Sequence, residues 1–148
     1  MRRSLAALAI LALTCAAAPA PRTIASPDAE ILSHPPGEGV LCGWAFMVAA
    51  REVGRQCFVG KDAEFQVTLQ DSVARLDAYA ARNGPFSPAQ IADFHRSMGK
   101  EGAPASELCQ GDLRALYEGY RSVGGGAIRS LTDAMVSRPG KPTWGTCT

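Results

Sequence analysis

The spacing of apolar residues along the chain predicts an all-α protein. After residue 39, apolar positions recur every three or four residues in five segments, and side chains at this spacing share one face of a helix. The alternation of apolar and polar residues that marks a strand is nowhere long enough to build a sheet. We therefore expect a compact bundle of four to five helices.

Segment 40–58 is expected to form the central helix of this bundle. It is apolar over most of its circumference, and a helix of that kind usually lies inside a bundle. Two apolar strips run along it, and the remaining polar positions are expected to face solvent. The first strip is Cys42, Phe46, Ala49, Val53 and Cys57, the second is Trp44, Met47 and Val48, and the polar positions are Arg51, Glu52, Arg55 and Gln56.

Two further helices follow, each with a start or stop signal. Apolar spacing from Phe65 to Ala80 predicts the second helix, with Asp62 as the N-cap that accepts a backbone hydrogen bond. Residues 83–85, Asn-Gly-Pro, end it because Asn and Gly adopt the left-handed C-cap conformation and Pro cannot continue a helix. Ser87 begins the third helix, since Ser-Pro-Ala-Gln is the sequence of a capping box.

The last two helices are expected on either side of a glycine run. Ser106 is the predicted N-cap of the fourth helix, and residues 124–126, all glycine, break it before a short fifth helix. An extended tail rich in proline and glycine then reaches Thr148. The apolar side of the fourth helix is Cys109, Leu113, Leu116, Tyr117 and Tyr120, and that of the fifth is Ile128, Leu131 and Met135.

The first 25 residues predict a signal peptide for Sec-type export. Two arginines precede an apolar run at 5–18, and small residues and proline follow it, as in such peptides. The run is shorter than the about 20 residues that span a bilayer, so we expect cleavage after Ala25 and no transmembrane segment. Residues 26–39 are expected to be a flexible tether and 40–148 a single domain, in the periplasm or outside the cell.

Charge and cysteine content refine this picture. Export removes three of the 15 basic residues and none of the 14 acidic ones, which leaves a formal charge of −2 and no indication of a nucleic-acid partner. Cys15 lies in the signal peptide, and Ala12 and Thr14 before it do not match a lipoprotein signal, so we expect no lipid anchor there. The four remaining cysteines of an exported chain predict two disulfides.

Helix geometry favours one pairing of these cysteines. In a helix over 40–58, Cys42 and Cys57 lie about 22 Å apart, whereas a disulfide needs a Cα separation of about 4 to 7 Å. Antiparallel helices with short connections bring Cys57 close to the start of the fourth helix. We therefore expect Cys57 to pair with Cys109, and Cys42 to pair with Cys147 in the tail.

His95 is the one candidate for catalysis, as a general base. Asp93 lies two residues before it and points to another side of the helix, so a carboxylate partner must come from another helix, such as Glu52 or Glu118. A surface or structural histidine is the simpler interpretation. The chain contains no motif for a metal, a haem or a phosphate-binding loop, so we expect no metal and no cofactor.

Surface recognition is the leading hypothesis for function. We expect an exported, disulfide-stabilised binding protein that contacts an extracytoplasmic protein through helix surface and tail, without catalysis. The alternatives are a small hydrolase-like enzyme that uses His95 as general base, and a carrier of an apolar ligand in the bundle core. Trp, Tyr and Arg are favoured at interfaces, although Trp and Tyr also fill protein cores. The candidate partner-binding residues of these types are Trp44, Tyr117, Tyr120, Arg121 and Trp144.

Overall fold

The structure is a computed structural model that describes residues 37, 39–145 and 147. In this part the chain forms five helices and no strand, which confirms the all-α prediction. The expected signal peptide, Cys15 and most of the tether lie outside the described residues. The helices are α2 (Val40–Cys57), α3 (Ala63–Asn83), α4 (Pro88–Met98), α5 (Ala105–Leu108) and α6 (Gly111–Val136).

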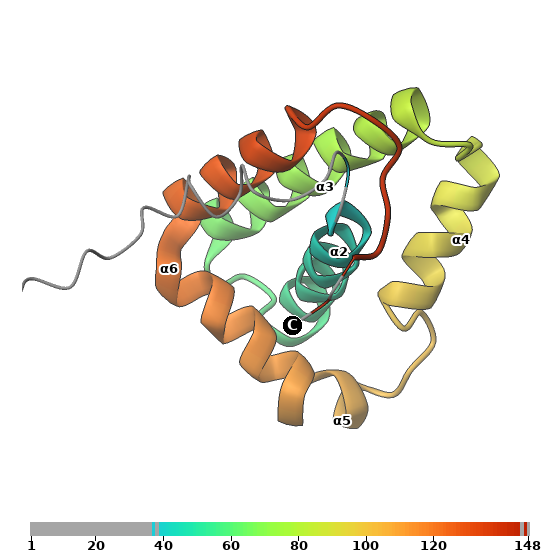
Figure 1. The fold of residues 1–148 in the computed structure, drawn as a ribbon. Helices are drawn as coiled ribbons and strands as arrows, with labels where there is room; N and C mark the ends of the chain where they lie inside the picture. Colours follow the sequence, from blue (N-terminus) through green and yellow to red (C-terminus); the bar gives the residue numbers. More distant parts are fainter. Residues whose placement is uncertain (1–36, 38, 146, 148) are drawn as a thin grey trace, which may run out of the picture.

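Helix α2 lies at the centre, with α3, α4 and α6 around it (Figure 1). Its strip of Trp44, Met47 and Val48 is at most 1% exposed, because the three surrounding helices all meet it. The burial expected for Phe46 was wrong, since this ring is 44% exposed. Spacing predicted an apolar helix, whereas the positions of the neighbouring helices decide which of its strips is covered.

Helix α3 lies beside the second half of α6 (Figure 1), and its ends correct two predictions. Asp62 has a left-handed backbone (φ 52°), and its side chain accepts no hydrogen bond from the helix. Its carboxylate instead accepts hydrogen bonds from Arg121 Nη1 at 2.9 and 3.0 Å and from Tyr117 Oη at 3.4 Å. The helix ends at Asn83 as expected, but Gly84 is extended (φ −124°) and not left-handed.

Helix α4 begins with the predicted capping box. Gln90 N donates to Ser87 Oγ at 3.3 Å, and Ser87 N donates to Gln90 Oε1 at 2.8 Å. None of the residues of α4 is fully buried, and the helix packs on α2 through Phe94, whose ring stacks on Trp44 at a centroid distance of 3.9 Å. This helix is therefore attached to the core by few apolar contacts.

The fourth predicted helix is two helices in the structure. Ser106 is not an N-cap, because α5 starts at Ala105 after Pro104 and α6 starts separately at Gly111. The glycine break is confirmed inside α6, where Gly124 has φ 84° and ψ 159° and the helix changes direction (Figure 1). Only glycine adopts this backbone conformation without strain.

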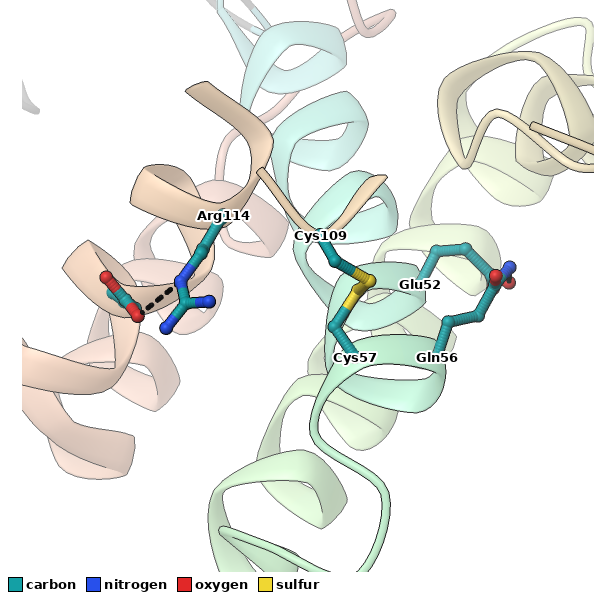
Figure 2. The surroundings of a disulfide bond; sticks show 6 residues. Glu52, Gln56, Cys57, Cys109 and Arg114 are labelled. Carbon is teal, nitrogen blue, oxygen red and sulfur yellow. Dashed lines mark hydrogen bonds and ion pairs between the residues drawn. A yellow bond between two sulfur atoms is a disulfide. The ribbon is translucent and has the colours of Figure 1, made fainter. Parts of the chain in front are cut away.

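Two disulfides close the fold with the pairing that helix geometry favoured. Cys57 is bonded to Cys109 with a Cα separation of 5.5 Å (Figure 2), and Cys42 is bonded to Cys147 with 5.6 Å. The tail is also held by its backbone, since Leu41 N donates to the carbonyl of Thr143 at 3.2 Å. No described helix is long and apolar enough to cross a membrane.

Candidate functional site

A chain of polar contacts joins three helices around His95. Trp44 Nε1 of α2 donates to Asp77 Oδ1 of α3 at 2.8 Å. His95 Nε2 of α4 lies 2.8 Å from the same oxygen, and Arg51 Nη2 of α2 lies 3.4 Å from His95 Nδ1. The side chains of His95 and Asp77 are 22% and 25% exposed, so solvent still reaches this pair.

These contacts define the tautomer of His95. A guanidinium can only donate hydrogen bonds, so Nδ1 beside Arg51 is the acceptor nitrogen of the ring. The proton therefore lies on Nε2, which donates to Asp77 Oδ1. The imidazole is thus fixed on one side by the Asp77 carboxylate, and its Nδ1 lone pair points towards Arg51.

Asp77 is the carboxylate partner of His95, and the expectation of Glu52 or Glu118 was wrong. Glu118 is on α6 and accepts a hydrogen bond from Arg114 at 2.9 Å. The role of Asp77 could have been predicted from the sequence, because the indole N–H of a buried Trp44 requires a hydrogen-bond acceptor from a neighbouring helix. Asp77 lies on the second helix beside its apolar positions and is able to supply that acceptor.

A hollow of about 420 Å³ opens beside His95. A second hollow of about 370 Å³ adjoins it, and the two share Arg51, Arg55 and Gln70. Lys61 and the apolar side chains of Ala63 and Val67 line the second one. The first hollow is lined by Arg51, Glu52, Arg55, Gln70, Ala92, His95, Arg96, Gly99 and Glu101.

Positive charge predominates around these two hollows. Their lining includes four basic side chains, Arg51, Arg55, Lys61 and Arg96, which we call the basic face. The acidic side chains in the same lining are Glu52 and Glu101 alone. The lining therefore has more basic than acidic side chains, although Arg55 is paired with Glu52 and Arg96 is paired with Asp93 beside the hollow.

Glu52 organises the middle of this face, and its predicted solvent exposure was wrong. Its residue is only 8% exposed, and its carboxylate accepts hydrogen bonds from Arg55 at 3.0 and 3.2 Å and from Gln56 at 2.6 Å. Burial alone raises the pKa of Glu52, but those hydrogen bonds and the charges of Arg55 and Arg51 outweigh it and lower the pKa. Figure 2 shows Glu52 and Gln56 side by side on α2.

Arg51 is the least solvated cation of the basic face. Burial lowers the pKa of its guanidinium, while Asp77 and Glu52 act in the opposite direction. An arginine remains protonated through the physiological pH range even so. Its guanidinium contacts His95, and both residues line the first hollow.

The predicted partner-binding residues do not form one surface. Trp44 and Tyr117 are core residues, 1% and 0% exposed, so neither side chain offers a contact surface, which corrects that prediction. Arg121 is exposed and paired with Asp62, and Tyr120 is half-buried on α6. Trp144 is 47% exposed and lies 6.1 Å from the Phe94 ring.

Burial of Tyr120 gives a testable dependence of stability on pH. Desolvation raises the pKa of its phenol from 10.0 to about 12. The unfolded chain loses this proton first, so stability that is complete below pH 10 is lost as pH rises towards 12. Denaturant unfolding across this range should show that the free energy of unfolding falls less steeply with pH in Tyr120→Phe than in the parent protein. Identical dependence on pH in the two proteins would contradict the raised pKa of Tyr120.

Neither metal chemistry nor an apolar cavity is indicated in the described ranges. No three His, Cys, Asp or Glu side chains there come together to hold a metal ion. A third hollow of about 430 Å³ near Gly124 is also open to solvent, and charged residues such as Arg121 and Arg129 line it. The carrier of an apolar ligand therefore gains no support from these hollows.

Comparison of this chain with protein-family models, with curated proteins and with solved structures found no match. Function has to be inferred from the chemistry of the two adjoining hollows and the residues between them.

Proposed function

We propose that this protein is an exported binding protein whose basic face holds an acidic segment of a partner protein outside the cytoplasm. The observation that carries this proposal is the pair of adjoining hollows that share Arg51 and Arg55. The first hollow offers cationic groups, and the second offers apolar side chains. Such a surface suits a peptide in which acidic and apolar side chains alternate.

Electrostatic and structural features both support this choice of partner. The positive charge of the face attracts acidic segments as they approach and repels basic segments. The face is built on α2, α3 and α4, and the Cys57–Cys109 disulfide lies next to Glu52 and Gln56 at the end of α2 (Figure 2). A binding surface on helices held by a disulfide loses little conformational freedom when the partner binds.

The disulfides support the location as well. Structural disulfides persist in oxidising compartments such as the periplasm and the extracellular space. Together with the signal peptide that the sequence predicts, they favour a protein that works outside the cytoplasm, where the tether of residues 26–39 precedes the helical domain.

Site-directed crosslinking in the producing cell tests the proposal. A photoreactive residue at Val67 lies in the second hollow, and Val123 is a matched control because the two are 68% and 60% exposed. We expect Val67 to crosslink to one partner protein through an acidic segment, which mass spectrometry identifies. Equal crosslinking from Val123, or attachment at Val67 to segments without acidic residues, would contradict the proposal.

A further inference from the structure

We propose that His95 and Asp77 form a general-base pair that hydrolyses a small carboxylic ester bound in the first hollow. This activity goes beyond partner binding, and it rests on the polar contacts around His95 and not on the excess of positive charge. His95 is the base, Asp77 is its positioning residue, and Arg51 stabilises the negative charge that develops on the ester.

The hydrogen-bonding partners of the histidine are arranged as a base requires. Nε2–H is bonded to Asp77 Oδ1 at 2.8 Å, and Trp44 Nε1 holds the same oxygen at 2.8 Å. Asp77 is thus fixed by a residue that is itself 1% exposed. A carboxylate that binds Nε2–H in this way orients the imidazole so that Nδ1 is the nitrogen that accepts a proton.

The hollow that His95 lines is one that a water molecule and a substrate are able to enter. His95 and Arg51 both line the first hollow, whose volume of about 420 Å³ is within the range of small-molecule sites. The 3.4 Å contact between Arg51 Nη2 and Nδ1 is longer than a strong hydrogen bond. Arg51 is therefore able to turn from Nδ1 to a substrate oxygen at little energetic cost.

The reaction needs no group besides water and the ester. Nδ1 of His95 takes a proton from water as the water oxygen bonds to the carbonyl carbon, and the carbonyl electron pair moves to oxygen beside Arg51. When this intermediate collapses, the bond to the alcohol oxygen breaks and that oxygen takes the proton from Nδ1. The products are a carboxylic acid and an alcohol, and His95 returns to its starting state.

The lining of the hollow selects water as the nucleophile and favours an anionic ester. No serine, threonine or cysteine lines this hollow, so the acyl-enzyme that a hydroxyl or thiol side chain would form is not available there. Arg55 and Arg96 lie in the same lining and are able to attract a carboxylate on the substrate. An ester that carries a second, free carboxylate therefore fits best.

Hydrolysis of p-nitrophenyl hemisuccinate, compared with neutral p-nitrophenyl acetate, tests this activity. The protein is the exported chain with both disulfides intact. We expect kcat/KM to be higher for the hemisuccinate, and His95→Ala to lower it by about 100-fold. Imidazole added to His95→Ala should restore part of the rate, which a purely structural histidine would not do. Arg75→Gln on α3 is the control, since Arg75 pairs with Asp133 away from the hollow.

Asp77→Asn separates positioning from folding. The amide oxygen is able to accept from both Trp44 Nε1 and His95 Nε2, as Oδ1 of Asp77 does, but the variant lacks the negative charge that stabilises the imidazolium formed during the reaction. We expect kcat to fall by at least about 10-fold with KM nearly unchanged, in a variant that melts cooperatively.

Two results would overturn the inference. One is a parent protein no faster than His95→Ala or free imidazole at the same concentration. The other is a His95→Ala variant that folds cooperatively, is inactive and gains nothing from imidazole. Lys61→Glu, at a residue that lines only the second hollow, should weaken binding of an acidic peptide but retain ester hydrolysis, so failure of either proposal leaves the other testable.

Discussion

Replacement of Cys42, Cys57, Cys109 and Cys147 by alanine is expected to unfold the helical domain. The Cys57–Cys109 bond has a sequence separation of 52 residues, and the loop-entropy model gives it about 4 kcal/mol. The Cys42–Cys147 bond spans 105 residues and encloses the first, so its additional contribution is also about 4 kcal/mol. The sum is comparable with the 5 to 15 kcal/mol by which typical domains are stable.

Removing one pair at a time should lower the stability of the protein in each case. Loss of Cys57–Cys109 frees the connection between α5 and α6 from the end of α2, and loss of Cys42–Cys147 frees the tail from its start. Denaturant unfolding followed by circular dichroism should show each loss as a lower midpoint. A change below about 1 kcal/mol for either pair would contradict the stabilising role assigned to it.

Much of the helical framework could be predicted because local rules determine it. The capping box at Ser87 involves only neighbouring residues, and the kink at Gly124 follows from the glycine run itself. For the disulfides, the rise of a helix and the reach of a disulfide exclude Cys42–Cys57, and the antiparallel order of consecutive helices then places Cys57 near Cys109. These features depend on local geometry and on the order of the helices along the chain.

The predictions that failed depend on contacts between helices. Phe46 and Glu52 exchanged their expected environments because α3, α4 and α6 cover only part of α2. Asp62 is not a cap because Arg121 and Tyr117, more than fifty residues later, engage its carboxylate. The spacing of apolar residues along one helix does not predict how that helix is rotated about its axis relative to its neighbours.

The candidate site was missed for the same reason. His95 was identified from the sequence, but Asp77 and Arg51 come to it from two other helices. The four residues of the basic face are scattered among acidic residues in the sequence. They come together around the two hollows only because α2 packs against α4 and the turn before α3 lies beside them.

Charge reversal within the basic face should abolish binding of an acidic partner. Arg55 lines both hollows and Lys61 lines the second, and both charges are reversed in Arg55→Glu with Lys61→Glu. The Arg55 change also removes the ion pair with Glu52, so cooperative unfolding of this variant is measured alongside its binding. Each change turns an attraction into a repulsion, which is on the order of tenfold in affinity per residue. Arg75→Glu with Arg82→Glu on α3 makes the same change in net charge outside the hollows.

The most direct measurement is a titration of these proteins with a labelled peptide of alternating glutamate and leucine. The parent protein and the α3 control should bind it with an affinity that falls as salt is added, and Arg55→Glu with Lys61→Glu should bind about 100-fold more weakly. Equal affinity of both double variants, or equal affinity of the parent protein for a lysine and leucine peptide, would contradict a basic face that recognises acidic segments.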